Sequence, residues 1–330
     1  MGLIGVYHGG DLAAATREFG DPADGWVDLS TGINPCPWPV PAAALDSLNR
    51  LPDSGQIATL CRAAAAAYGI GDATRVACGP GSQALIQWLP RLRAACRVAV
   101  VAPTYGEHAP TWQAAGHEVF ETADLPDASD CDVAVLTRPN NPDGSMVDAG
   151  DMAALALAMA RKGGTLVVDE AFADLEPGPS VATSVPAGMI TLRSFGKFYG
   201  LPGLRLGFVV SDPVTAAALA AALGPWPVSS LAADIGAEAL ADTGWQAATR
   251  DKLRRSAARL DGLLTGAGLE VLGGTDLFRL AALDDAASIH QRLGRAGLYT
   301  RRFPENPGLL RFGLPGSQTD WDRLEKALKP

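Results

Sequence analysis

The chain has 330 residues, which fits about two domains of ~150 residues each and excludes a peptide or a small disulfide scaffold. It carries 27 basic and 36 acidic residues, a formal net charge of −9, so its field repels nucleic acid and anionic membrane surfaces. Hydrophobic residues make up 48% of the chain, and there are 37 glycines and 24 prolines. This composition supports a large core with many sharp turns and excludes a disordered or fibrous protein.

The cysteines are odd in number and widely spaced, with neither a CxxC pair nor the pattern of a disulfide framework. They are Cys36, Cys61, Cys78, Cys96 and Cys131. We expect reduced thiols and no metal site. The N-terminal segment lacks a basic region followed by a long apolar run, and the uncharged run at 213–233 is interrupted by glycine and proline. The sequence therefore predicts a cytoplasmic protein without a membrane span.

Up to about residue 225, short runs of β-branched residues alternate with amphipathic stretches rich in alanine and leucine. This alternation is typical of strand–helix–strand units and predicts a mainly parallel sheet with helices between most strands. The predicted strands are Arg75–Cys78, Arg97–Ala102, Glu118–Glu121, Asp132–Thr137, Thr165–Val168, Ile190–Arg193 and Leu206–Val210.

The pattern changes after Pro227 to long helical stretches followed by short strands, which predicts a smaller α+β domain. The expected elements are helices at Ser229–Ala241 and Gly244–Gly266, strands at Leu269–Leu272 and Leu277–Ala282, a helix around Asp284–Ala296, two short strands and a last helix from Gln318. Residues 1–40 are rich in glycine and proline and too irregular to fold alone. We therefore expect a large domain at 41–225 and a smaller domain at 226–330, with 1–40 packed on the smaller domain or over the cleft.

The segment SFGKFYGLPGLRLGF places Ser194, Lys197 and Arg205 between two predicted strands. A lysine in an apolar setting has its charged form disfavoured, and its neutral amine can form a Schiff base with an aldehyde. A solvated loop lysine is the other interpretation, and it would be the better one for Lys197 considered alone.

Two polar residues follow other predicted strands. Asp169 stands just past the apolar run of TLVVDEAF, where active groups of open α/β sheets collect. At about 3 Å from a pyridinium nitrogen, a carboxylate would favour the protonated ring by roughly 5 kcal/mol at an effective dielectric of 20. Asn141 in RPNNPDG precedes a proline, and its amide could donate to a phenolate oxygen. The alternatives are a carboxylate that caps the following loop and a simple Pro-Asn-Gly turn.

A glycine-rich segment, CGPGSQALI, follows the first predicted strand and opens a helix. Gly79 and Gly81 permit a tight turn, and Ser82 with the free N–H groups of the helix could bind a phosphate. The segment also matches a loose dinucleotide fingerprint, but the acid expected after the next strand is missing, and so is the Lys-Ser/Thr pair of a P-loop. A purely structural turn is the alternative unless Ser194 and Arg205 converge on it as further donors.

Together, GPGSQ, APTYG, RPNNPDG, VVDEAF and SFGKFYGLPGLRLGF resemble, in order and spacing, the fold-type I pyridoxal-phosphate (PLP) enzymes of the aspartate aminotransferase superfamily. The resemblance implies an α/β fold, with a large PLP-binding domain around a mainly parallel sheet and a smaller α+β domain. It also implies PLP as cofactor and a homodimer. The cofactor would contact Gly81, Ser82, Gln83, Tyr105, Asn141, Asp169, Phe172, Ser194, Lys197 and Arg205.

The same resemblance assigns catalytic roles. Lys197 would bind the cofactor aldehyde, Asp169 would pair with the pyridine nitrogen, and Tyr105 would stack on the ring. Two positions depart from the pattern of many relatives: Phe172 replaces a tyrosine that donates to the phenolate, and Leu51 replaces a tyrosine that reaches the neighbouring subunit's cofactor phosphate.

Within that superfamily, YHGGD at 7–11, DLSTGINPCPWP at 28–39 and PWPVSSLA resemble the L-threonine O-3-phosphate decarboxylase family of cobalamin biosynthesis. The implied substrate is a small amino-acid phosphate, which is decarboxylated to an aminopropanol phosphate. His8 would lie near the substrate phosphate, Gly32 and Ile33 would lie near its carboxylate, and Arg311 would clamp the carboxylate. Asn141 would also contact the substrate. A histidinol-phosphate aminotransferase or related transaminase is the alternative activity, and a non-catalytic PLP-fold ligand-binding module is the alternative of another class.

Overall fold

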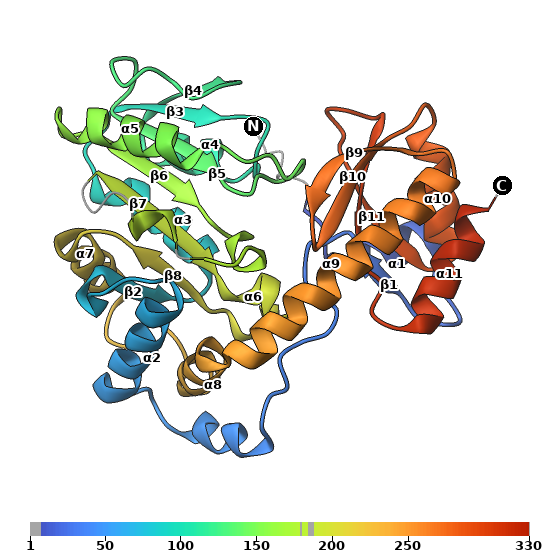
Figure 1. Cartoon of the computed structure of the whole chain (residues 1–330), viewed down its shortest axis with the longest axis horizontal. Helices are drawn as coiled ribbons and strands as arrows, with labels where there is room; N and C mark the ends of the chain where they lie inside the picture. The colour runs from blue at the N-terminus through green and yellow to red at the C-terminus, as the bar shows by residue number, and fades with distance from the viewer. Residues whose placement is uncertain (1–7, 179, 184–187, 330) are drawn as a thin grey trace. The chain divides into compact units, whose positions relative to one another are not determined.

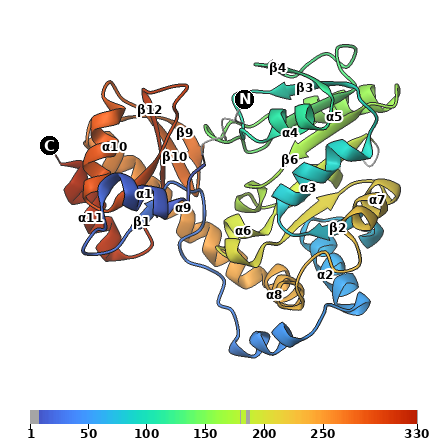
Figure 2. The same ribbon diagram turned by 180° about the vertical axis from the view of Figure 1, so that it is seen from behind.

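The computed structural model describes residues 8–178, 180–183 and 188–329 (Figures 1 and 2), so Tyr7 of the YHGGD segment lies outside the described residues. The chain divides into two compact units. The larger unit comprises Pro37–Asn141 and Ser145–Gln246, and the smaller unit comprises Met1–Cys36, Pro142–Gly144 and Ala247–Pro330.

A seven-stranded sheet forms the centre of the larger unit, in the order β2-β8-β7-β6-β5-β3-β4. All neighbouring strands are parallel except those that pair with β8. The strands are β2 (Val76–Gly79), β3 (Arg97–Val101), β4 (Glu118–Thr122), β5 (Val133–Thr137), β6 (Thr165–Asp169), β7 (Met189–Ser194) and β8 (Gly207–Val210). The seven predicted strands and the fold class are confirmed. The strands were recognisable because a sheet buried on both faces requires near-continuous runs of valine, isoleucine and leucine.

Helices cover both faces of this sheet. They are α2 (Ser54–Ala67), α3 (Ser82–Trp88), α4 (His108–Ala114), α5 (Ala149–Ala160), α6 (Phe195–Phe198), α7 (Pro213–Leu223) and α8 (Ser230–Ala241). Short 3-10 helices lie in the connections, at Ala42–Asn49, Ala73–Arg75, Leu89–Leu92, Ala173–Leu175, Val181–Thr183 and Pro202–Leu204. Helix α8 packs against α2.

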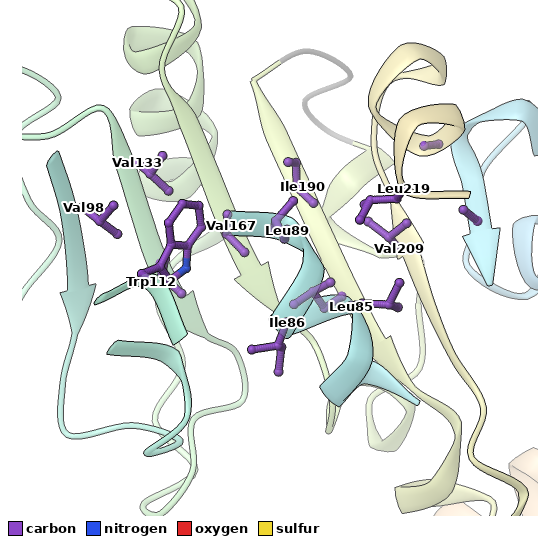
Figure 3. Packing of buried hydrophobic residues seen from close by; sticks show 14 of the residues in the cluster. Leu85, Ile86, Leu89, Val98, Trp112, Val133, Val167, Ile190, Val209 and Leu219 are labelled. Carbon is purple, nitrogen blue, oxygen red and sulfur yellow. The ribbon is translucent and has the colours of Figure 1, made fainter. Parts of the chain in front are cut away.

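Two hydrophobic clusters fill the space between the sheet and its helices. The first, which we call the front cluster, joins α3 and α4 to one face of the sheet and includes Leu85, Trp112 and Val167 (Figure 3). The second, the back cluster, joins α5 to the opposite face and includes Met152 and Val168. Val167 and Val168 are consecutive in β6, so side chains of this strand alternate between the two clusters.

The smaller unit is built on a five-stranded sheet in the order β1-β11-β12-β10-β9. Its strands are β1 (Val27–Leu29), β9 (Glu270–Thr275), β10 (Phe278–Ala282), β11 (Leu298–Arg302) and β12 (Leu309–Gly313). Its helices are α1 (Leu12–Phe19), α10 (Ala286–Arg295) and α11 (Gln318–Leu328), and α9 (Thr243–Gly266) enters it from the larger unit. The elements predicted after Pro227 are all present, but α8, expected in a smaller domain at 226–330, falls in the larger unit, which extends to Gln246.

The N-terminal elements were not predicted from the sequence. Helix α1 begins after Asp11, whose carboxylate accepts a hydrogen bond from the backbone N–H of Ala14 at 2.8 Å, and it ends at Gly20, where φ is +82°. Strand β1 pairs in parallel with β11, at the other end of the chain. A three-residue strand with such a distant partner carries too short a pattern to be recognised from sequence alone.

Over the described residues, none of the helices combines the length and the apolar character needed to cross a bilayer. The five cysteines are free thiols. The same part of the chain contains no cluster of three or more His, Cys, Asp or Glu side chains suited to a metal ion.

His290 makes the smaller unit sensitive to acid. It is fully buried in α10, and its Nδ1 lies 2.8 Å from the hydroxyl oxygen of Thr300. Burial, followed by the positive charge of Arg302, lowers the pKa of His290 to about 4. In the unfolded chain a histidine binds its proton with a pKa of about 6.5. The stability that the folded protein gains from the neutral, buried His290 is therefore fully present above pH ~6.5 and is lost as the pH falls toward 4.

We predict that His290→Gln makes the protein less sensitive to acid. Between pH 7 and pH 4 the wild type should lose roughly 3 kcal/mol more unfolding free energy than the variant, because glutamine does not titrate. Urea unfolding at the two pH values measures the difference. An equal loss in both proteins would contradict the assignment to His290.

Candidate active site

The ten predicted cofactor residues all belong to the larger unit and lie at one edge of its sheet. Strands β2, β3, β5, β6 and β7 run in the same direction, so their carboxyl ends meet at this edge, and β8 begins there because it is antiparallel to β2 and β7. Open α/β sheets bind ligands at this position. The residues that the topology brings to this edge are Gly81, Ser82, Gln83, Tyr105, Asn141, Asp169, Phe172, Ser194, Lys197 and Arg205.

Gly81 and Arg205 form a close cradle at the start of α3. Gly81 has φ +84°, and a Cβ atom there would lie 2.5 Å from Nη2 of Arg205. Arg205 itself adopts a left-handed backbone, with φ +51°, and its Nη1 donates to the carbonyl of Pro202 at 3.0 Å. Gly207 allows a similar approach, because a Cβ there would overlap the backbone nitrogen of Ser82, and Gly207 pairs with Ser194 in the ladder. Backbone N–H groups, hydroxyls and a guanidinium in this arrangement suit a phosphate.

The carboxylate of Asp169 is buried at the end of β6 and held through both oxygens. Its Oδ1 accepts from the backbone N–H of Ala171 at 2.9 Å, and its Oδ2 lies 3.1 Å from Nε2 of His108. His108 is also buried, and its ring meets the ring of Tyr105 edge-on, with 5.8 Å between centroids. His108 is not among the residues predicted from the sequence, although its position three residues after Tyr105, at the start of a helix, is a usable signal.

A hydrogen-bond chain orients Tyr105. Its hydroxyl donates to Oε1 of Gln83 at 2.9 Å, and Nε2 of Gln83 donates to Oε2 of Glu107 at 3.2 Å. These two hydrogen bonds join the loop after β3 to the first turn of α3. Tyr105 also packs against the front cluster, so its ring is supported from two sides.

Lys197 lies on the short helix α6 in mainly aromatic surroundings. Its side chain is half-buried, and Nζ is 5.8 Å from the centroid of the buried Phe172 ring. Phe195 and Tyr199, which flank Lys197 in sequence, stack on one another at 4.3 Å between centroids. The amine is therefore held beside apolar ring surface and is partly shielded from water.

The loop after β5 is fixed by Asn140, the neighbour of Asn141. The backbone N–H of Asn140 donates to the carbonyl of Ser145 at 2.9 Å, and its side-chain amide donates to the carbonyl of Pro103 at 3.0 Å. Its Oδ1 accepts from the hydroxyl of Thr104 at 2.9 Å. Asn141 is half-buried at the end of this braced segment.

In the smaller unit, Arg311 and the N-terminal segment meet at Ser30. Arg311 on β12 is buried, and its Nη2 donates to the carbonyl of Ser30 at 2.9 Å. The backbone N–H of Gly10 donates to the hydroxyl of Ser30 at 2.7 Å, and a Cβ at Gly9 would overlap the Ser30 carbonyl. His8 is exposed beside these glycines.

Ser30 also begins the loop that holds two other predicted substrate residues, the buried Gly32 and the half-buried Ile33. Four of the five predicted substrate residues, His8, Gly32, Ile33 and Arg311, therefore lie around one point of the smaller unit. The fifth, Asn141, belongs to the larger unit.

Two arginines face one another in this part of the structure. Arg301 on β11 is paired directly with Arg311 on β12, and the Arg311 guanidinium lies over the ring of Phe278 at 4.8 Å. Burial, and then the charge of Arg301, lowers the pKa of Arg311 to about 9, with a partial offset from Asp28. Like charges on directly opposed strand residues are unfavourable, so this pair favours a bound anion. Arg301 was not singled out from the sequence, although an Arg-Arg pair in a short strand before Arg311 was a usable signal.

Comparisons with known proteins identify the family of the chain. Residues 24–328 match the model of the aminotransferase class I and II family. The chain is 42% identical to a threonine-phosphate decarboxylase from Pseudomonas aeruginosa, over 97% of this chain and 96% of that protein. It is 43% identical to one from Sinorhizobium sp, over 98% and 97%.

Solved structures show the same fold. A histidinol-phosphate aminotransferase from Sinorhizobium meliloti, solved in complex with pyridoxal-5'-phosphate, matches with a TM-score of 0.80 at 24% identity, over 96% of this chain and 92% of that one. The chain therefore belongs to the aminotransferase class I and II family.

Proposed function

We propose that this protein is a PLP-dependent decarboxylase that converts L-threonine O-3-phosphate to an aminopropanol phosphate. The similarity to threonine-phosphate decarboxylases over almost the whole chain carries the proposal. The facing pair Arg301 and Arg311 supports it, because the substrate bears both a carboxylate and a phosphate. The product would supply the aminopropanol linker of cobalamin.

The larger unit has the donors that PLP requires. Its phosphate would be held by Gly81, Ser82, Ser194 and Arg205, whose close approach depends on glycine at 81 and 207. When bound, PLP acts as an electron sink that allows a bond at the amino-acid Cα to break.

Each remaining residue at this edge has a separate task. Asp169, braced by His108, would keep a proton on the pyridine nitrogen, and Asn141 would donate to the phenolic oxygen. Tyr105 would stack on the ring in the orientation that Gln83 fixes. Lys197 would bind the cofactor aldehyde and, after CO2 has left, return a proton to Cα. Phe172 offers a ring face but no donor to the phenolic oxygen.

The predicted substrate residues would determine which Cα bond breaks. When bound, PLP would accept the electrons of one substrate Cα bond, so the residues that hold the carboxylate and the phosphate would decide which bond is oriented for cleavage. Arg311 would bind the carboxylate, together with backbone at Gly32 and Ile33, while Arg301 and His8 would bind the phosphate. Two anions held at a fixed separation restrict rotation of the substrate, which is how binding energy selects one reaction.

The decisive experiment supplies O-phosphothreonine to the purified protein and identifies the products. We expect equal amounts of CO2 and aminopropanol phosphate, with no requirement for a 2-oxo acid. Consumption of 2-oxoglutarate in equal amount with histidinol phosphate would favour the transaminase instead. Bound PLP without turnover of any amino acid would favour the ligand-binding module.

We also propose that the protein is a cytoplasmic homodimer. An open cavity of about 460 Å³ in the larger unit is lined by apolar side chains that include Leu48, Leu51 and Trp226, which are 63%, 65% and 58% exposed. Side chains of this size rarely remain grouped in water unless a partner covers them. A second copy of the chain is the proposed partner, and light scattering during gel filtration measures the oligomeric state.

Substrate selection gives a further prediction. His8→Ala should lower kcat/KM for O-phosphothreonine by roughly tenfold to 150-fold, because a charge-assisted hydrogen bond contributes about 1.5 to 3 kcal/mol. The variant should leave kcat/KM for unphosphorylated threonine almost unchanged. Steady-state kinetics with both substrates measures the two effects.

Arg311→Ala is the matched variant, because both substrates have the carboxylate. It should lower kcat/KM for threonine and for phosphothreonine alike. An equal loss for both substrates in the His8 variant would assign His8 a structural role in the N-terminal segment.

A further inference from the structure

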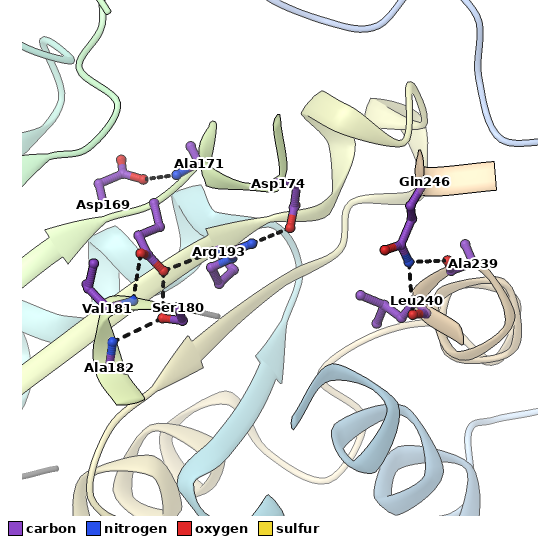
Figure 4. Close-up of polar contacts among 11 residues, drawn as sticks. Asp169, Ala171, Asp174, Ser180, Val181, Ala182, Arg193, Ala239, Leu240 and Gln246 are labelled. Atoms are coloured by element: carbon purple, nitrogen blue, oxygen red, sulfur yellow. Dashed lines mark hydrogen bonds and ion pairs between the residues drawn. The ribbon is translucent and has the colours of Figure 1, made fainter. Parts of the chain in front are cut away.

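A buried ion-pair network lies immediately beside the cofactor residues, in the part of the larger unit shown in Figure 4. Nη1 of Arg193 donates to Oε2 of Glu170 at 2.9 Å, and Nη2 of Arg193 is bonded to Oδ1 of Asp174. The guanidinium also lies over the ring of Tyr68, 4.2 Å from its centroid. All four residues are buried.

Two further donors bind the Glu170 carboxylate in this network. Glu170 also accepts from the hydroxyl of Ser180 at 2.6 Å and from the backbone N–H of Val181 at 3.1 Å. Burial by itself lowers the pKa of Arg193, but the carboxylates of Asp174 and Glu170 outweigh this effect and raise the pKa above its ordinary value. The guanidinium therefore stays charged and linked to both carboxylates.

Two cofactor residues directly adjoin this network in sequence, since Asp169 precedes Glu170 and Ser194 follows Arg193. Asp169 follows Val167 by two residues in β6, and Ser194 follows Leu192 by two residues in β7. Val167 and Leu192 belong to the front cluster, so Asp169 and Ser194 face the front of the sheet.

Glu170 and Arg193 therefore face the back of the sheet. The backbone N–H of Glu170 donates to the carbonyl of Leu192 at 2.8 Å, so the ladder between β6 and β7 continues to this residue. The ion pair thus crosses between the two strand ends, on the opposite side from the cofactor residues that those ends carry.

We propose that Arg193 is a positioning residue: its bonds to Glu170 and Asp174 fix the ends of β6 and β7, and thereby the separation of Asp169 from Ser194. This role rests on the proposed function, because it takes Asp169 and Ser194 as the partners of the PLP nitrogen and phosphate. A one-residue slip or a splaying of the two ends would spoil both contacts together.

Stability alone is a weaker explanation for this network. A buried ion pair can often be replaced by neutral groups of similar volume without loss of stability, whereas removal of one partner leaves an uncompensated charge. A neutral replacement that is as stable as the wild type therefore separates a positioning role from a stabilising role. If the network only stabilises the fold, such a variant should bind PLP as tightly as the wild type.

The test uses the combined variant Arg193→Met, Glu170→Gln and Asp174→Asn, with Arg193→Lys as a second variant. Glutamine retains an acceptor for Val181 and an amide that can donate to Ser180, and lysine retains the charge but cannot reach two carboxylates as a planar fork. Three quantities are measured for each protein: the melting temperature of the PLP-free form, the Kd for PLP, and the visible circular dichroism per bound cofactor.

We expect the combined variant to melt within about 4 °C of the wild type. We expect its Kd for PLP to rise at least about tenfold, which corresponds to ~1.4 kcal/mol, and its visible circular dichroism per bound PLP to fall. Arg193→Lys should show the same weakening of PLP binding. Wild-type affinity in either folded variant would overturn the proposal.

Glu118→Gln is the matched control. Glu118 pairs with Arg97 at 3.2 Å across β3 and β4 of the same sheet, and both side chains are exposed. Loss of this exposed ion pair should leave the Kd for PLP unchanged. If Glu118→Gln weakened PLP binding as much as the Arg193 variants do, a specific role for Arg193 would be overturned. Failure of the proposed function is recognised separately, because a wild type that binds PLP but does not decarboxylate O-phosphothreonine still reports the effect of Arg193.

Discussion

Lys197→Ala is expected to abolish turnover and covalent capture of the cofactor, with a fall in kcat of at least about four orders of magnitude. The amine of Lys197 would both bind the cofactor aldehyde and return the proton to Cα, so one substitution removes two steps. The visible absorbance of the bound lysine-linked cofactor should disappear. Rapid-quench or steady-state assays of CO2 release measure the loss of activity.

Lys162→Ala provides the control, because Lys162 is an exposed lysine of the same unit, just beyond α5. This variant should keep both the absorbance and the activity. Borohydride reduction followed by peptide mapping identifies the attached lysine directly. Recovery of the label on Lys162, or on any lysine other than Lys197, would refute the assignment.

Asp169→Asn is expected to produce the second largest effect, a fall in kcat of more than about a thousandfold. A carboxylate about 3 Å from a pyridinium nitrogen is worth roughly 5 kcal/mol at an effective dielectric of 20, and the amide removes that charge at nearly constant volume. Because the ring nitrogen would then bind its proton only at lower pH, the remaining activity should rise as the pH is lowered. The measurement is kcat as a function of pH for the variant and the wild type.

His108→Gln is the matched variant for this prediction. It keeps a donor near Oδ2 of Asp169 but loses the imidazole that lies 3.1 Å away, so its kcat should fall much less than that of Asp169→Asn. A similar pH profile in Asp169→Asn and the wild type would show that the carboxylate does not set the protonation of the cofactor.

The larger unit could be predicted well because its signals are local. Each strand of its sheet is a short apolar run, and each expected strand agrees with the structure to within one residue at either end. The residues that follow those runs lie at one edge of the sheet by topology, which is consistent with the grouping of Asp169, Ser194 and Lys197 that the family resemblance implies.

The parts that could not be predicted depend on distant contacts. His108 becomes notable only through its approach to Asp169, and Arg301 only through its place opposite Arg311 in the β11–β12 ladder. The same holds for Arg193. In the sequence it is a single charged residue at the end of an apolar strand, and only the structure shows its ion pairs with Glu170 and Asp174.

The parallel pairing of Val27–Leu29 with Leu298–Thr300 has a consequence for synthesis of the protein. At roughly 5–20 residues per second, the ribosome makes the partner strand tens of seconds after the N-terminal strand has emerged. During that interval Val27 and Leu29, which are buried in the finished protein, have no sheet to join. Residues 27–29 thus reach their native place only after the strand at 298–300 has been made, and a solubilising fusion on their N-terminal side should raise the yield of folded protein more than a C-terminal fusion does.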